Sequence, residues 1–240
     1  MKPDTWQQGT HCLLYDAEQL ENPGIEWFDA EQLHAAGCVD GEASGRGQAL
    51  FLRVGTRPCV LRHYRRGGLF AKLLGDRYLR VGAERSRPFR EWRLLAELTR
   101  EGLPVPHPVA ARLSCHGLFC RADLITGRIE GAVTLVDHLA EDDGPPLDWA
   151  ALGTCLRRFH DHGIWHADLN ARNILTRTGA EFFLIDFDRG RRRRPGRWQR
   201  ANLERLRRSL RKMYQAGRID WQEQTDWPAL EHGYAQAGKS

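Results

Sequence analysis

Lysine, methionine and paired cysteines are scarce in this chain of 240 residues. It holds four Lys beside 32 Arg, two Met, and six Cys with no C-x-x-C spacing. Scattered thiols argue against a zinc site or a disulfide framework, so we expect reduced cysteines in ordinary packing positions. No apolar run reaches the roughly 18 residues of a transmembrane helix, and the N-terminus lacks the apolar core of a signal peptide. We therefore expect a cytoplasmic protein.

Positive charge is concentrated in one segment. The net charge is +5, but residues 189–212 hold eleven Arg and one Lys against a single acid, Glu204, and carry +11, which leaves −6 for the rest. Such a block predicts an anionic partner: a membrane surface, an anionic substrate or a nucleic acid. A solvated helix face is the alternative. Only Trp198 and Tyr214 accompany the arginines and no nucleic-acid-binding motif is present, so nucleic acid is not the expected partner.

Apolar spacing predicts a β-rich first part and a helical second part. Helices are predicted at 89–100, 148–162 and 200–217, where apolar residues recur on one side. Strands are predicted at 48–54, 58–64, within 105–124, at 173–176 and at 181–185. Residues 1–39 show no such pattern, and we expect an irregular lead-in there.

A polar cluster follows the second predicted helix. It consists of H-A-D-L-N-A-R-N (166–173) and of Asp186, thirteen residues beyond Asn173. Asp168 can accept the proton of an attacking hydroxyl, while Asn173 and Asp186 offer hard oxygen ligands to Mg²⁺, which neutralises phosphates. A hairpin with its turn at 178–180 would hold the two ligands opposite each other. The spacing is typical of a kinase phosphotransfer site.

Weaker signals upstream suit the same chemistry. Gly45 and Gly47 lie in a Gly-rich turn before the strand at 48–54, where backbone N–H groups can approach phosphate oxygens. Glu91, near the start of its helix, can pair with a basic residue on the preceding strand and fix that residue against ATP phosphates. A plain alternative for Glu91 is an acid that favours a helix N-terminus.

Taken together, these residues resemble the lipopolysaccharide core kinases of Gram-negative bacteria. The resemblance covers about residues 40–215 and rests on the Gly-rich loop, V-L-R-H-Y-R-R-G-G (60–68), the Glu91 helix, G-L-P-V-P (102–106), H-A-D-L-N-A-R-N-I-L (166–175) and L-I-D-F-D-R-G-R (184–191). It implies an α+β, protein-kinase-like fold with a β-rich N-terminal lobe (40–128) and a mostly helical C-terminal lobe (129–240).

The resemblance also implies an activity. This is ATP-dependent phosphorylation of the 4-hydroxyl of 3-deoxy-D-manno-octulosonic acid (Kdo) on Kdo-lipid A precursor, at the cytoplasmic face of the inner membrane. ATP and Mg²⁺ are the implied cofactors, and segment 189–212 is placed to meet the anionic acceptor or the lipid around it. Residue by residue, the implied roles are catalytic base for Asp168, metal ligands for Asn173 and Asp186, helix glutamate for Glu91, phosphate-loop glycines for Gly45 and Gly47, and a structural histidine for His166.

The chain departs from the protein-kinase pattern in three places. Arg62 stands where those kinases have a lysine. It can bridge ATP phosphates and Glu91, and Lys72 is the nearby substitute. Asp188 replaces the glycine of D-F-G, and no A-P-E follows, which favours a small or lipid-linked acceptor. Another small-molecule or atypical protein kinase is one alternative, and a catalytically silent kinase-fold adaptor at the membrane is another.

Overall fold

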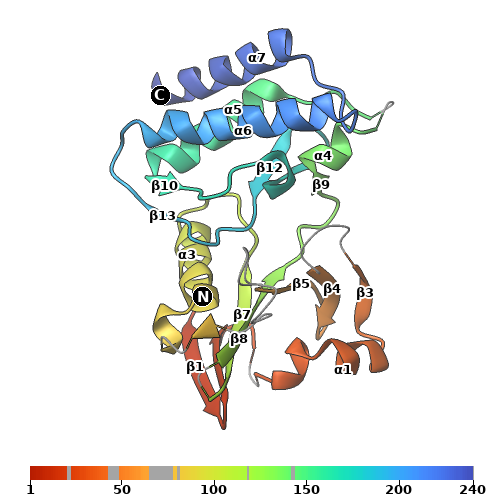
Figure 1. Cartoon of the computed structure of the whole chain (residues 1–240), viewed down its shortest axis with the longest axis vertical. Helices are drawn as coiled ribbons and strands as arrows, with labels where there is room; N and C mark the ends of the chain where they lie inside the picture. The colour runs from red at the N-terminus through yellow and green to blue at the C-terminus, as the bar shows by residue number, and fades with distance from the viewer. Residues whose placement is uncertain are drawn as a thin grey trace. The chain divides into compact units, whose positions relative to one another are not determined.

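An antiparallel sheet dominates the first half of the chain (Figure 1). The computed structural model describes residues 1–20, 23–42, 49–64, 78–79, 82–117, 119–141 and 144–239. In these ranges the sheet has eight strands in the order β1-β2-β7-β8-β5-β4-β3, with β6 paired to β8. The strands are β1 (Pro3–Gln8), β2 (His11–Asp16), β3 (Val39–Glu42), β4 (Ala49–Val54), β5 (Arg57–His63), β6 (Tyr78–Leu79), β7 (Pro108–His116) and β8 (Phe119–Gly127).

The chain divides into two units. Unit 1 comprises Met1–Arg100 and Pro106–Glu130, and unit 2 comprises Glu101–Val105 and Gly131–Ser240. Unit 1 contains the sheet, and unit 2 is mostly helical. The fold is therefore α+β, as the sequence predicted.

One face of the sheet buries the apolar side chains of β4 and β5. Leu50 and Leu52 of β4 and Leu61 of β5 are at most 4% exposed, and they pack with Phe28 and Leu33. Phe28 ends a short 3-10 helix (Ile25–Phe28), and Leu33 lies in α1 (Ala30–Ala35). The alternation that predicted these two strands reflects the burial of one strand face.

Helix α3 (Arg87–Arg100) packs against β7 and β8. A 3-10 turn (Ala83–Arg85) precedes the helix. Trp92, Leu95 and Leu98 are at most 1% exposed, so the predicted apolar stripe is the buried side of the helix. Glu91 is buried as well. A buried carboxylate usually has a partner, and the partners of Glu91 belong to the candidate site.

The first 39 residues are structured, contrary to the expected irregular lead-in. β1 and β2 form a hairpin, and β2 pairs with β7, so the hairpin belongs to the sheet of unit 1. The strands escaped prediction because β1 is almost entirely exposed and so has no apolar face. β2 carries an unbroken apolar run rather than alternating residues.

Two cysteines form a disulfide, which corrects the expectation that all thiols are reduced. Cys115 and Cys120 lie opposite each other in the β7–β8 hairpin, with their Cα atoms 4.0 Å apart. The pairing depends on the register of the hairpin, which the spacing of the cysteines alone did not reveal. The other four cysteines are free: Cys12, Cys38, Cys59 and Cys155.

Unit 2 consists mainly of helices, together with a two-stranded and a three-stranded sheet (Figure 1). Its helices are α4 (Leu135–His138), α5 (Trp149–Asp161), η3 (Ala171–Asn173), α6 (Trp198–Gln215), α7 (Glu223–Gln236) and η4 (Ala237–Lys239). Its strands are β9 (Val133–Thr134), β10 (Ile164–Trp165), β11 (Ile174–Arg177), β12 (Glu181–Leu184) and β13 (Arg191–Arg192). The side chain of Asp148, the first residue of the predicted helix, accepts the N–H of Ala151 at 2.8 Å and caps α5.

Helices α5 and α7 approach closely because each has a glycine at the contact. A Cβ atom on Gly153 of α5 would lie 2.0 Å from the carbonyl oxygen of Leu230, and one on Gly233 of α7 would lie 2.0 Å from that of Ala150. Helix α7 was not predicted. It contains Pro228, and its buried residues are few: Trp227, Leu230 and Gly233.

We predict that Gly153→Ala destabilises the protein. The new methyl group meets the backbone of α7, which cannot rotate away, so the loss is about 1–3 kcal/mol despite better helix propensity. Thermal unfolding measures the loss. Gly196→Ala is the matched control, because the nearest atom to its Cβ would be 3.9 Å away. Equal melting temperatures for the two variants would contradict the close contact.

Candidate active site

The β11–β12 hairpin brings the two predicted metal ligands to the same end of a strand pair. Ile174 pairs with Leu184, and one step further the N–H of Ile185 donates to the carbonyl oxygen of Asn173 at 3.0 Å. Asn173 therefore directly precedes β11, and Asp186 follows β12 after one residue. The predicted hairpin is confirmed.

The turn of this hairpin needs a left-handed backbone. Thr178 and Gly179 have φ of 59° and 75°, and the N–H of Ala180 donates to the carbonyl oxygen of Arg177. Positive φ at both central residues matches the twist of the flanking strands. A Cβ atom at Gly179 would also lie 2.6 Å from the carbonyl oxygen of Pro146, so glycine fits this position on two grounds.

The side chain of Asn173 is oriented by the loop that precedes it. Its Nδ2 donates to the backbone oxygen of Asp168 at 2.9 Å. Because the amide nitrogen is used there, the amide oxygen remains as the ligand atom. Asp186 has a left-handed φ of 62°, which Asp adopts more readily than most residues. An amide oxygen and a carboxylate are donors that Mg²⁺ accepts beside water and substrate phosphates, so this pair fits the ion.

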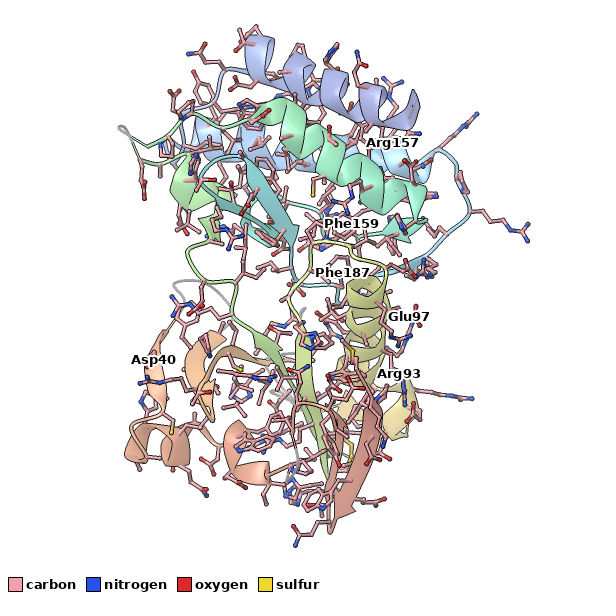
Figure 2. The ribbon with its side chains drawn as sticks, turned by 180° about the vertical axis from the view of Figure 1, so that it is seen from behind. Asp40, Arg93, Glu97, Arg157, Phe159 and Phe187 are labelled. Atoms are coloured by element: carbon pink, nitrogen blue, oxygen red, sulfur yellow. A yellow bond between two sulfur atoms is a disulfide. The ribbon has the colours of Figure 1, made fainter. Side chains whose placement is uncertain are left out.

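Phe187 anchors the backbone next to Asp186. Its ring is 1% exposed and lies near the ring of Phe159 in α5 (Figure 2), with the ring centroids 5.9 Å apart. The centroid of the His166 ring is 4.8 Å away. Within the described ranges, no three His, Cys, Asp or Glu side chains form a metal-binding group, so the candidate site depends on the amide of Asn173 as well as the carboxylate.

His166 is a structural residue, as the sequence implied. Its Nε2 donates to the carbonyl oxygen of Ile185 at 2.9 Å, and its Nδ1 accepts the N–H of Asp168 at 3.2 Å. Burial lowers the pKa of His166, which keeps the ring neutral with its proton on Nε2. The ring therefore connects the loop before Asp168 to the segment before Asp186.

Helix α6 holds the catalytic loop (166–173) through polar side chains on its buried side. Asn202 donates from Nδ2 to the carbonyl oxygen of His166 at 2.8 Å, and its Oδ1 accepts the His166 N–H at 3.3 Å. One further contact joins the hydroxyl oxygen of Ser209 to the N–H of Ala171 at 3.2 Å. Asn202 and Ser209 are seven residues apart, two turns on one helix face. These two residues were missed from the sequence, where only their spacing beside Leu203, Leu206 and Leu210 could have revealed them.

Asp168 itself is half exposed and paired. The Nε of Arg205 donates to its Oδ1 at 3.1 Å, and the Nη2 of Arg205 contacts the same oxygen. The candidate base thus lies on a fixed loop with its carboxylate open to a ligand. Arg205 also comes from α6, between the two residues that hold the loop.

Unit 1 carries the second part of the predicted site. Arg62 of β5 pairs with the Oε1 of Glu91 at 2.5 Å, as predicted. Tyr64, on the same strand face as Arg62, donates its hydroxyl to the Oε2 of Glu91, and Arg62 donates to that hydroxyl at 3.1 Å. Burial raises the pKa of Tyr64, so its hydroxyl keeps the proton it donates. Gly45, Gly47 and Lys72 lie outside the described residues.

Part of the basic segment 189–212 is engaged with its own unit. Ion pairs join Arg192 to Glu101, Arg205 to Asp168, and both Arg207 and Arg211 to Glu223. The guanidinium carbons of Arg191 and Arg193 lie 5.0 Å and 4.5 Å from the ring centroid of Trp165. Within the described ranges, the cationic side chains of this segment without a hydrogen bond, ion pair or ring contact are those of Arg189, Arg194, Arg197, Arg200, Arg208 and Lys212. In the described part of the chain no helix is both long enough and apolar enough to span a membrane.

Comparison with known proteins identifies relatives along almost the whole chain. Residues 30–234 match the model of the lipopolysaccharide kinase (Kdo/WaaP) family. A 3-deoxy-D-manno-octulosonic acid kinase of Vibrio parahaemolyticus is 40% identical over 218 residues, which cover 91% of this chain and 92% of the relative. The kinase of the same name from Xanthomonas euvesicatoria is 44% identical, with 86% and 82% covered, and that from Stenotrophomonas maltophilia (strain K279a) is 40% identical, with 96% and 92% covered.

We predict that Asn202→Leu loosens the catalytic loop. The substitution leaves the N–H and the carbonyl of His166 buried without their partner, and each unmade hydrogen bond costs about 1–3 kcal/mol. Denaturant unfolding measures the loss of stability. Gln215→Leu, at the exposed end of the same helix, controls for the change from a polar to an apolar side chain. A loss at Asn202 no greater than at Gln215 would contradict the proposed hold on the loop.

Proposed function

The chain belongs to the lipopolysaccharide kinase (Kdo/WaaP) family, and from this premise we propose that it transfers a phosphoryl group from ATP to the 4-hydroxyl of Kdo on Kdo-lipid A precursor. The kinase activity follows from the family. The acceptor and the hydroxyl are our proposal. The phosphotransfer part of the proposal is supported by the hydrogen bond from the Nδ2 of Asn173 to the backbone oxygen of Asp168, which links the candidate base to a candidate metal ligand. The proposed acceptor is supported by the names of the relatives.

In this proposal Asp168 accepts the proton of the acceptor hydroxyl. Its carboxylate is half exposed and therefore reachable, while its backbone is fixed by His166 and Asn173. Asn173 and Asp186 would hold Mg²⁺. The bound ion would neutralise charge on the transferred phosphoryl group. Positioning and charge neutralisation account for most of the catalysis in reactions of this kind.

Arg62 is the proposed contact to the ATP phosphates. The buried Glu91 and the hydroxyl of Tyr64 fix its guanidinium group, which is about a quarter exposed. An arginine offers a planar fork in place of the point charge of lysine. The intact pair of Arg62 and Glu91 supports an active kinase over a silent adaptor.

The loop after β13 is the proposed contact to anionic lipid or to the anionic part of the acceptor. Arg194 and Arg197 are exposed in this loop and Arg200 in the first turn of α6, and none of them has a side-chain partner within the described ranges. We propose that these residues hold the protein at the cytoplasmic face of the inner membrane. The arginines with ion pairs or ring contacts are left out of this proposed surface, which comprises Arg194, Arg197 and Arg200.

We predict that Asp168→Asn abolishes most of the phosphate transfer from ATP to Kdo-lipid A precursor. Removing a general base costs roughly a hundredfold to ten-thousandfold in rate. A radiolabelled transfer assay with Mg²⁺ measures the loss, and Asp220→Asn, at an exposed site, is the control. If the wild type transferred phosphate only to a different hydroxyl compound, the proposed kinase site would stand and the proposed acceptor would be wrong.

We predict that the double variant Arg194→Gln/Arg197→Gln binds anionic vesicles more weakly than the wild type. Each lost surface contact weakens binding by about 1 kcal/mol, so the two together give roughly a tenfold to thirtyfold loss. Vesicle sedimentation with and without anionic lipid measures it.

The matched control is Arg207→Gln/Arg211→Gln. It removes the same charge from two arginines that are already paired with Glu223. An equal loss in both double variants would mean that binding depends on net charge alone, which would argue against the loop as a specific surface.

A further inference from the structure

Helix α6 brings a cation directly to the candidate base. Arg205 and Asp168 are 48% and 52% exposed, and the Nε and Nη2 of Arg205 both contact the Oδ1 of Asp168. An ion pair this exposed adds little to stability. Its position beside the reacting group is therefore the feature that needs an explanation.

Both groups keep unused hydrogen-bonding capacity. A guanidinium group has five N–H donors, and the contacts to Oδ1 use two of them. Among the described residues, no other acceptor meets Arg205 and no donor meets the Oδ2 of Asp168. If an acceptor hydroxyl donated to Oδ2, the unused N–H groups of Arg205 would lie beside it, because Arg205 is bound to the Oδ1 of the same carboxylate.

We propose that Arg205 is an acceptor-specificity residue that binds the carboxylate of the sugar acid whose hydroxyl is held by Asp168. This inference rests on the proposed function, because the relatives are named for an octulosonic acid. A sugar acid carries its carboxylate within a few bonds of its ring hydroxyls, so both groups can reach the Asp168–Arg205 pair together. Arginine suits this role because its fork binds a carboxylate at two points.

Other arginines of α6 are less suited to this role. Arg207 and Arg211 share Glu223, which already supplies their carboxylate. Arg208 is exposed one turn beyond Arg205, and its side chain has no contact to the catalytic loop within the described ranges. Arg208 is therefore the matched control, since it carries the same charge on the same helix.

The test compares two acceptors, the Kdo-containing sugar acid and its neutral carboxamide, with the wild type, Arg205→Gln, Arg205→Lys and Arg208→Gln. We expect Arg205→Gln to lower kcat/KM for the carboxylate acceptor roughly tenfold to a hundredfold more than for the carboxamide, mostly through KM. Arg205→Lys should restore part of the difference, and Arg208→Gln should leave the ratio between acceptors unchanged.

Equal losses on both acceptors would overturn the proposal, because Arg205 would then act only by positioning Asp168. Unchanged kinetics on both would overturn it as well. Failure of the proposed function looks different, since the wild type itself would then transfer phosphate to neither acceptor. Matching melting temperatures for the wild type and the Arg205 variants show that kinetic losses do not come from unfolding.

Discussion

The two hydrogen bonds between Asn202 and the backbone of His166 are the contact on which the catalytic loop depends. His166 and Asn202 are both buried, so the backbone N–H and carbonyl of His166 need partners there. Among the described residues no strand pairs with His166 to provide them. A side-chain amide has N–H donors and an acceptor oxygen, so the amide of Asn202 makes both hydrogen bonds that a neighbouring strand would otherwise make. Ser209 does the same for Ala171 two turns later.

With the backbone of the loop held in this way, the functional side chains have defined directions. His166 reaches across to the carbonyl of Ile185, and Asn173 turns its nitrogen back onto Asp168. Asp168 is left with an exposed carboxylate and an arginine on one oxygen. The loop thus has a buried side, which includes His166, and an exposed carboxylate on Asp168. A side chain that meets a substrate from a rigid support needs this combination.

Most of this site could be predicted from the sequence because its signals are local. The hairpin between Asn173 and Asp186, the cap of α5 and the apolar stripe of α3 each lie within a few turns or strands of chain. Asn202 could not be predicted in the same way, since it is 36 residues from its partner and its contact depends on the tertiary fold. The hairpin of β1 and β2 was missed for another reason, because β1 is exposed along almost its whole length and so has no apolar face to detect.

Charge shows a similar limit of sequence reasoning. Summing residues 189–212 gives +11, but the acids that compensate part of this charge come from other elements: Glu101, Asp168 and Glu223. The sum treats all the arginines alike, whereas the fold separates those with ion pairs in unit 2 from those whose side chains have no partner within the described residues. Arg62 in unit 1 is another charged residue whose full set of partners only the fold reveals. It stands where protein kinases have a lysine, and its guanidinium fork contacts both Glu91 and Tyr64. A buried Glu91 without this cation would be strongly destabilising. Two apolar residues could fill the same space at no cost in stability, so stability alone does not require the ion pair.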